Sequence, residues 1–592
     1  MINTENQAPD GMTNPVTPSQ SFSNPDIEKH KQIITEGKAQ GSLGTLLAYT
    51  KLSGPGWIQS AITLGGGSLS SALYLGIIAG FAFMWVQPLA MILGVIMLSA
   101  IAYVTLSTGK SPFKAINEHI SPVLGWGWLL ASMAANMVWS MPQFSLATAA
   151  VQQNLLPQFL GEGGIPEPWS KIIIVGTTLA VAATVVMLYS RGGWGVKAFD
   201  WTMKTMVGGI VLCFFAVVIR MSISGEVAWN KIFLGLIPSW SSLSEPTASF
   251  SPFLADLTAE GRAYWSGLIV DQQRSIIISA AAAAVGINMT FLLPYSMLKK
   301  GWSKEFKGLA VFDLSTGLFI PFVIATACVV IVSASQFHAK IPAGLENSQN
   351  NLELQVPKTL QSGYQKNLEG RLKSQLGGEA FANLSDNDII QQISKMPVAE
   401  KRMAAMLVKR DAFQLSNALT PITGPTLAHY IFGLGIFGMA LSTAIVLMTI
   451  NGFCLCEALN KPGNKHYFRI GVFMVFIGAI GPFAWNQAKL WLAIPTSVFG
   501  MVLLPIAYIA FFLLMNQKTL LGKQTPQGKM KFVWNGAMFV ATLVAGGSSL
   551  WVLWSKLQFT GIFIFAAFFL AVLIGSKLKK RNSPSATVHE TG

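Results

Sequence analysis

Two short polar interruptions stand out in an otherwise apolar sequence. The first is Gly65-Gly66-Gly67-Ser68, and the second is Gly286-Ile287-Asn288-Met289-Thr290. A helix that is broken inside a membrane leaves backbone N–H and C=O groups unpaired, and this is tolerated only where they face protein, water or a ligand. The free N–H groups bind anionic groups, and the free C=O groups bind cations. The two interruptions therefore predict one central site for a small ion or a small polar molecule, as in a transporter.

The interruptions lie in apolar spans of membrane length. Of the 592 residues, 52% are hydrophobic and 11% charged, whereas an average soluble domain has roughly 25% charged residues. Since about 20 helical residues cross a bilayer, the recurring apolar runs predict an all-α polytopic membrane protein. Away from their edges these spans contain no Asp or Glu. The twelve predicted spans are 53–78, 80–106, 124–155, 171–189, 199–221, 273–299, 308–335, 427–456, 469–487, 490–516, 532–555 and 558–577.

The net charge of +15 follows the predicted membrane topology. The connections from even to odd spans carry fifteen Lys and Arg against four acids. Positive residues stay on the cytoplasmic side, so we expect both termini to be cytoplasmic and the protein to be integral to the plasma or inner membrane. The charge thus gives no reason to expect nucleic-acid binding, and the lipid bilayer is the expected surrounding. The four cysteines lie within or at the end of spans, which predicts buried apolar filler and no disulfide framework.

Several anchors frame the first interruption and recur further along the chain. Gly54-Pro55-Gly56-Trp57 begins the first span, and Gly80-Phe81-Ala82-Phe83-Met84-Trp85 opens the second. With these anchors, residues 50–525 resemble the Nramp family of divalent-metal transporters. That family's first span runs from Gly-Pro to an Asp-Pro-Gly-Asn break, and its second opens with Gly-aromatic-x-x-x-Trp. Further similar stretches are Leu106-Ser107-Thr108-Gly109-Lys110, Asp313, Phe337-His338, Gly438 to Thr449, and Leu504-Pro505 through Leu521-Gly522.

The resemblance implies a LeuT-like architecture, with spans 1–5 and 6–10 as inverted repeats and two peripheral helices. Residues 1–50 are then a cytoplasmic polar tail, 51–221 the first repeat, and 222–272 an outer loop. The second repeat is divided into 273–336 and 427–516 by an outer helical insert at 337–426. Spans 11 and 12 occupy 517–577, and a basic cytoplasmic tail follows at 578–592. In the insert, Ser385 or Asp386 is expected to cap a helix; the insert is either a small subdomain or a solvated lid or spacer.

The departures from the family concern the metal ligands. The family's first-break Asp and Asn are replaced here by Gly65 and Ser68. Its sixth-span Ala-x-x-Met-Pro-His aligns in one register with Val285 at the carbonyl position, Asn288 at the Met and Thr290 at the His. A shift by one residue makes Met289 the thioether instead. The third span offers no acid where the family carries acids that help to move protons.

The expected ligands are therefore neutral. The resemblance and the two interruptions predict a substrate site formed by Gly65, Gly66, Gly67, Ser68, Val285, Asn288 and Thr290, with Ser68, Asn288 and Met289 as candidate metal ligands. Removing a divalent ion from water without anionic ligands is very costly, since even a single isolated charge costs tens of kcal/mol in a dry site. Mg²⁺ keeps its water and suits neutral oxygens. A hydrated hard cation such as Mg²⁺, carried without proton coupling, fits this set best.

Other readings remain open from the sequence. The Gly65–Gly67 run would let a small organic or zwitterionic substrate approach the backbone, or it could simply allow close helix packing. Thr496-Ser497 could face the pathway or serve only in packing. A non-transporting sensor on the same fold would also show an intact scaffold with lost ligands. No nucleophile, base or metal cluster marks an enzyme, and no cofactor is expected.

Overall fold

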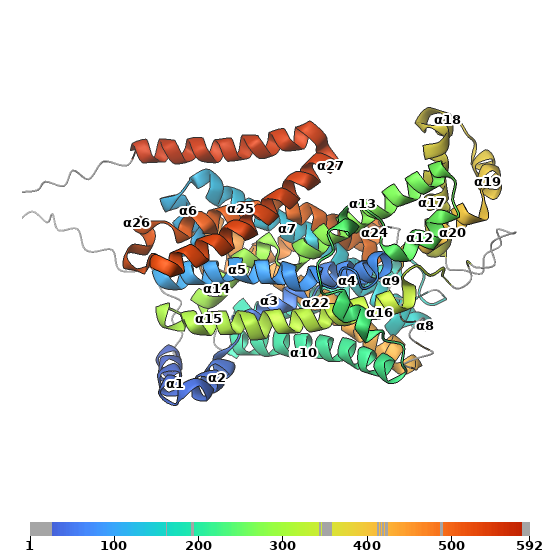
Figure 1. Ribbon diagram of the computed structural model, residues 1–592. Helices are drawn as coiled ribbons and strands as arrows, with labels where there is room; N and C mark the ends of the chain where they lie inside the picture. The colour runs from blue at the N-terminus through green and yellow to red at the C-terminus, as the bar shows by residue number, and fades with distance from the viewer. Residues whose placement is uncertain are drawn as a thin grey trace, which may run out of the picture.

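The computed structural model shows a nearly all-helical molecule in which long helices lie side by side (Figure 1). It describes residues 26–161, 163–190, 194–342, 345, 358–410, 414, 416, 420, 424–485 and 489–582. Helix α1 (Ile27–Ala39) and the last residues of α27 (Gly528–Asn582) lie at one end of the bundle, which we call the termini end. Helices α17–α20 of the insert project from the opposite end, which we call the insert end.

Both predicted interruptions separate pairs of helices. The first lies between α3 (Pro55–Thr63) and α4 (Gly66–Ala79), whose axes differ in direction by 53°. The second lies between α13 (Ala259–Ala284) and α14 (Ile287–Lys299). Helix α13 begins well before the predicted span start at 273. The side chain of Thr258 caps its first turn by accepting from Gly261 N, so the helix extends into a polar stretch that hydropathy does not mark.

Nine helices in the described part of the chain are long and apolar enough to cross a membrane, or ten if the bent pair α3–α4 is one span. Two features account for the difference between these ten spans and the predicted twelve. The predicted span 124–155 forms α7 (Pro122–Ala149) and the π-helix η1 (Ala150–Leu155), which are not among the nine. The last two predicted spans form one continuous assignment, α27 (Gly528–Asn582), with non-helical backbone at Gln558.

Burial separates central helices from peripheral ones. The apolar window of Ala259–Lys299, which contains α13 and α14, is 83% buried, whereas that of α27 is 11% buried. Helices α7 and α22 pack extensively against each other, as do α4 and α16. The broken helices therefore lie inside the bundle. The remaining membrane-length elements are α5 (Val86–Thr108), α9 (Trp169–Ser190), α10 (Trp194–Ile223), α15 (Lys307–Leu314) with η5 (Ser315–Phe319) and α16 (Ile320–Phe337), η6 (Thr426–Ile431) with α22 (Phe432–Ala458), α23 (Lys465–Met474) with η7 (Val475–Ile480) and α24 (Gly481–Ala484), and α25 (Ala493–Met515).

Shorter helices lie at the two ends of the bundle. Two of them, α1 and α2, occupy much of the predicted polar tail at the termini end, near the start of α3. In the insert, Ser385 caps α19 and forms a capping box with Asp388, which confirms the predicted helix start. The shorter helices are α1 (Ile27–Ala39), α2 (Gly41–Leu52), α6 (Pro112–His119), α8 (Pro157–Leu160), α11 (Trp229–Leu234), η2 (Ser241–Leu243), η3 (Ala248–Phe250), α12 (Ser251–Ala255), η4 (Lys304–Phe306), α17 (Lys358–Leu376), α18 (Gly378–Ala382), α19 (Asp386–Ser394), α20 (Val398–Met406), η8 (Lys489–Leu492), α26 (Lys518–Leu521) and η9 (Gly522–Gln524).

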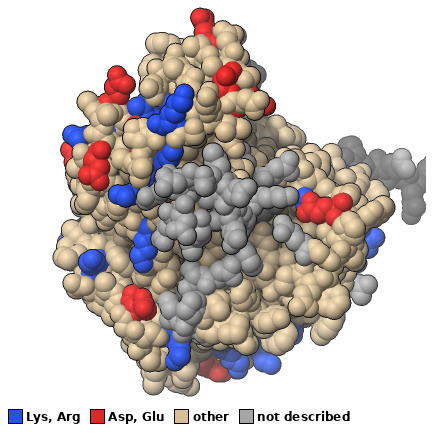
Figure 2. Space-filling model, turned by 90° about the vertical axis from the view of Figure 1, so that its right-hand side faces the viewer, with Lys and Arg blue, Asp and Glu red and all other residues tan. Residues whose placement is uncertain are grey.

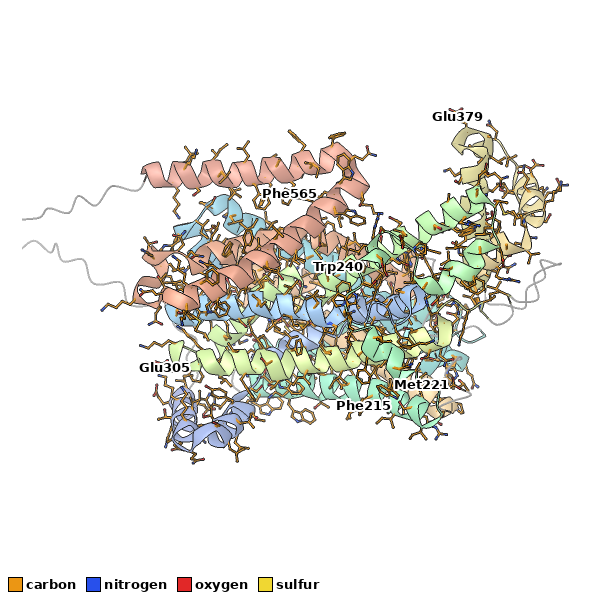
Figure 3. All side chains as sticks on the ribbon, in the orientation of Figure 1. Phe215, Met221, Trp240, Glu305, Glu379 and Phe565 are labelled. Carbon is orange, nitrogen blue, oxygen red and sulfur yellow. The ribbon has the colours of Figure 1, made fainter. Side chains whose placement is uncertain are left out.

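The two labelled acidic side chains lie at opposite ends of the molecule. Figure 3 places Glu305 at the termini end and Glu379 at the tip of the insert, whereas Phe215 lies on the side of α10 and Phe565 on α27. On the insert end, Lys and Arg are interspersed with Asp and Glu and do not form one patch of a single sign (Figure 2). This distribution is the one expected for a bundle whose sides face lipid.

Candidate functional site

The first break brings a glycine against a neighbouring helix. Leu64 (φ −77°, ψ 48°) and Gly65 (φ −106°, ψ −172°) leave the helical conformation between α3 and α4. A Cβ atom added to Gly65 would overlap Thr443 Oγ1 on α22 and lie 2.9 Å from Ile62 O. Gly65 is therefore required by a close approach between the break and α22.

The second break is packed against a tryptophan. Val285 (φ −142°, ψ 102°) and Gly286 (φ −81°, ψ 163°) separate α13 from α14. The ring of Trp139 occupies the space where a Cβ of Gly286 would be, and its indole donates to Thr496 O at 2.7 Å. Trp139 thus joins the second break to α25.

A cavity lies between the two breaks. The space open to the centres of water molecules is about 30 Å³, which is room for about two waters. Among the described residues that line it, none is Asp, Glu, His or Cys. The described part of the chain also contains no cluster of three or more such residues that could hold a metal ion. The lining residues are Ile62, Thr63, Gly67, Ser68, Trp139, Pro142, Gln143, Ala283, Gly286, Asn288, Met289, Thr443, Leu447, Thr496 and Ser497.

Neutral side chains satisfy backbone groups at the breaks. Gly66 N, at the start of α4, donates to Gln143 Oε1 at 2.9 Å. Ser68 Oγ donates to Ala283 O at 3.2 Å, near the end of α13. Thr63 Oγ1 lies 3.3 Å from Ala284 O and 3.1 Å from Met289 Sδ. The helix ends therefore present hydroxyl and amide oxygens to the cavity, together with the Met289 thioether, without a fixed negative charge.

Three fully buried asparagines form a chain beside the cavity. Asn288 Nδ2 donates to Asn136 Oδ1 at 3.0 Å, and Asn136 Nδ2 donates to Asn451 Oδ1 at 2.8 Å. Asn288 Oδ1 accepts from Met289 N at 2.9 Å. The chain links α14, α7 and α22 and fixes the orientation of the Asn288 amide.

The predicted site residues fall into two groups. Gly67, Ser68, Asn288 and Met289 line the cavity, and so do Thr496 and Ser497, whose role the sequence left open. The other predicted residues, Gly65, Gly66, Val285 and Thr290, belong to the breaks but are not in the lining.

Two of the residues outside the lining have clear packing roles. The Val285 side chain occupies the space beside Gly94. Thr290 Oγ1 accepts from Trp128 Nε1 at 2.8 Å and donates to Ile287 O. Both residues therefore support the second break from outside the cavity.

Some lining residues were missed as site residues. Thr63 lies immediately before the first break, and Thr443 lies in the small-polar run of span 8. Gln143 lies in the third predicted span, 124–155, and the oxygen of its amide caps α4. The position of Thr63 beside a break and that of Thr443 inside a run of small residues are the signals that could have identified these two residues, whereas Gln143 has no such signal.

Buried carboxylates occur away from the cavity, toward the termini end. Asp313, 1% exposed, accepts from Gly54 N at 3.0 Å, from Gly56 N at 2.6 Å and from the Ser53 hydroxyl. It thereby caps the first turn of α3. Glu457 accepts from Ser111 Oγ at 3.2 Å, and the partly buried Asp200 pairs with Lys300 at 2.5 Å.

The arrangement defines a class of protein. Membrane-length helices around two broken spans, with a polar cavity where the breaks meet, form the architecture of a secondary transporter. A family profile described as natural resistance-associated macrophage protein-like (Nramp) matches residues 56–358 and 398–555, well over half of the chain. The chain belongs to the Nramp family, which confirms the resemblance found in the sequence.

Individual relatives are distant. The chain is 23% identical over 194 residues to the divalent metal cation transporter MntH of Brucella suis, and 23% identical over 195 residues to the metal transporter Nramp3.2 of Populus trichocarpa. These matches cover 33% and 32% of this chain and only 38% and 34% of the two relatives. The structure is similar to that of the Eremococcus coleocola manganese transporter, with a TM-score of 0.57, 15% identity and coverage of 91% of this chain and 94% of the other. This likeness supports the predicted fold class.

Proposed function

We propose that the protein is a secondary transporter for a divalent metal cation. Membership of the Nramp family supports this function, as do the relatives named as divalent metal cation and metal transporters. The cavity is placed where such a transporter binds its substrate, at the interface between the two broken spans.

The proposed cargo is a hydrated hard cation such as Mg²⁺. The observation that carries this choice is the lining, in which the described residues offer hydroxyl, amide and carbonyl oxygens but no carboxylate. A soft transition metal is favoured by thiolate, imidazole or thioether ligands, and Met289 is the single such side chain in the described lining. Mg²⁺ dehydrates reluctantly and is held through its waters. Because the cavity has room for only about two waters, transport of such an ion requires the cavity to widen.

Proton coupling is not part of this function. A proton carrier beside the ion would need a titratable group in the cavity, and the described lining has none. The described carboxylates Asp313 and Glu457 lie elsewhere and bind backbone or hydroxyl donors. The ion would then move down its own gradient under the membrane potential, which contributes about 2.3 kcal/mol per charge per 100 mV. The basic connections favour a cell membrane location with both termini in the cytoplasm.

Flux into proteoliposomes tests the proposal. Mg²⁺, Mn²⁺ and internal pH are followed in parallel under an imposed negative potential, for the wild-type protein and for Asn288→Leu. We expect Mg²⁺ entry without acidification and a reduction in Asn288→Leu, because the variant loses an amide in the cavity wall. Ser315→Ala, an exposed change on η5, is the matched control and should transport normally.

Other outcomes identify the alternatives. Mn²⁺ entry with acidification would contradict both the Mg²⁺ choice and the absence of proton coupling. If neither ion moves, the cation proposal fails. The protein would then be a transporter of a small organic or zwitterionic substrate, or a sensor that does not transport.

A further inference from the structure

The insert is attached to one of the helices that form the cavity. Glu400 on α20 accepts from Arg371 Nε on α17 at 3.1 and 3.2 Å, and also from the indole N–H of Trp265 on α13. Each of the three residues is at most 5% exposed. Helix α13 has 26 residues, or about 39 Å at 1.5 Å per residue, and its far end carries Ala283 in the cavity lining. The insert therefore contacts the same continuous helix that ends at the second break.

A segment that follows α20 forms a second attachment. We call residues Leu407–Arg410 the cover segment; most of it is buried. Arg410 O accepts from Tyr74 on α4 at 2.8 Å, and Lys409 Nζ lies 3.9 Å from the centroid of the Trp491 ring. Arg410 Nη2 also donates to Lys340 O at 2.9 Å. The cover segment thus contacts α4 through Tyr74 and η8 through Trp491.

The Tyr74 and Trp491 rings contact each other as well as the cover segment. Their centroids are 4.7 Å apart in an edge-to-face arrangement, a geometry that aromatic pairs prefer. Tyr74 follows the lining residue Ser68 by six residues on α4, which is about 9 Å along the helix. Trp491 belongs to η8, which directly precedes α25, and α25 carries the lining residue Thr496. The ring pair therefore joins α4 to the start of α25 on the insert side of the cavity.

The contact between Lys409 and the Trp491 ring is weak enough to break when the cover segment moves. Burial, and to a smaller extent the charge of Lys366, lowers the pKa of the Lys409 ammonium to about 8. A charged amine is therefore disfavoured in this position and is held mainly by the face of the Trp491 ring. The Lys409 ammonium can therefore leave the Trp491 ring without the cost of breaking a buried ion pair.

The insert is also an addition to the family pattern. The Nramp profile matches residues up to 358 and again from 398, so it leaves out α18, α19 and nearly all of α17. Arg371 lies in the unmatched part, whereas Glu400 and the cover segment lie just after it. A function of the insert is therefore specific to chains that carry it.

We propose that helices α17–α20 and the cover segment form a gate for the insert end of the bundle, and that the cavity opens toward this end only when the cover segment leaves Tyr74 and Trp491. Because Trp265 on α13 donates to Glu400 on α20, release of the cover segment is coupled to movement of α13. The inference concerns access to the cavity and is independent of which solute is carried.

Thiol labelling of the full-length protein in proteoliposomes tests the gate. Ser497→Cys places a thiol in the cavity wall, and a membrane-impermeant thiol reagent is added to the side on which the insert lies. Tyr74→Phe removes the hydroxyl that binds the cover segment but keeps the ring pair, and Lys409→Gln removes the ammonium over Trp491. We expect each to raise the labelling rate about fivefold, the factor that corresponds to one ordinary hydrogen bond.

Two further variants make the test decisive. Trp265→Phe removes the indole donor to Glu400 but keeps the Arg371 pair that holds the insert together, and it should also raise labelling. Lys401→Gln changes an α20 side chain whose bond is to Ser394 O within the insert, and it should leave labelling unchanged. Unchanged labelling in Tyr74→Phe and Lys409→Gln, or an equal rise in Lys401→Gln, would overturn the proposal. Because no transported ion is measured, failure of this test is separate from failure of the cation proposal.

Discussion

The termini end of the bundle contains a buried carboxylate, whereas the described residues that line the cavity are all neutral. At the termini end, Asp313 is almost fully buried, yet two backbone N–H groups and a hydroxyl bind its carboxylate. In the cavity, equally buried positions such as Ser68 and Asn288 are neutral. Both regions contain the N-terminus of a helix, which can stabilise an anion.

The difference shows that the fold can bury carboxylates but does not place one in the described cavity lining. In the cavity, the N-terminus of α4 is capped by the neutral amide of Gln143, whereas the N-terminus of α3 is capped by Asp313. The Asp313 carboxylate binds backbone donors at α3, whereas the cap at α4 is neutral and adds no carboxylate to the described cavity lining. Substitutions that remove or change the charge of Asp313 and Gln143 test the contrast between these two caps.

The largest expected effect is the loss of the α3 cap. Asp313→Leu leaves Gly54 N and Gly56 N buried and unpaired, which should lower the free energy of unfolding by about 3 kcal/mol or more. Asp313→Asn keeps one acceptor oxygen and should recover part of this loss. Thermal unfolding of the purified protein measures both variants. A wild-type unfolding temperature for Asp313→Leu would show that this carboxylate does not hold α3.

The next effect concerns the close approach at the first break. Gly65→Ala places a Cβ against Thr443 Oγ1 and should reduce transport at least about tenfold, which corresponds to about 1.4 kcal/mol. The matched control is Gly67→Ala, whose Cβ would lie 3.2 Å from Ser497 Oγ and 3.4 Å from Ala283 Cβ, a milder contact. Initial rates of uptake measure both. The double change Gly65→Ala with Thr443→Ala should recover part of the rate, and equal loss in both glycine variants would contradict the specific role of Gly65.

A smaller effect is expected from changing the neutral cap. Gln143→Leu leaves Gly66 N without its acceptor, at a cost of about 1–3 kcal/mol. Gln143→Glu instead keeps an acceptor and adds a negative charge at the N-terminus of α4, which the helix dipole favours. Because a carboxylate can bind a metal ion directly and Mg²⁺ gives up its water reluctantly, we expect Gln143→Glu to shift the preference from Mg²⁺ toward Mn²⁺, as measured by competition in uptake. An unchanged preference would mean that the charge of the lining does not set ion choice.

The smallest effect is expected at the termini end. Glu457→Gln keeps the acceptor for Ser111 Oγ and changes only the charge, outside the described cavity lining. Uptake should stay within about twofold of the wild type, less than one ordinary hydrogen bond. A large loss, or a new dependence of uptake on pH, would show that this carboxylate takes part in transport and would remove the contrast between the two regions.

The sequence located the breaks more reliably than the contacts around them. Glycine runs and polar residues inside apolar spans mark where helices end, and Gly65 and Gly286 lie between helices as expected. The fold class and the family were likewise predictable from anchors and spacing. The pairing of Gln143 with Gly66, or of Trp139 with Gly286, depends on how distant spans pack, which hydropathy does not encode. For the same reason Thr290 was expected at the site but binds Trp128 outside the cavity lining.

The most direct test of the central claim is the membrane potential at which net Mg²⁺ flux stops. Proteoliposomes with a tenfold Mg²⁺ gradient are clamped at a series of potentials, with and without a pH gradient. A carrier that moves one divalent ion and no protons should reverse at about 30 mV for that gradient, whatever the pH difference. A reversal potential that shifts with the pH gradient would show that protons move with the ion and would contradict the proposed transport without proton coupling.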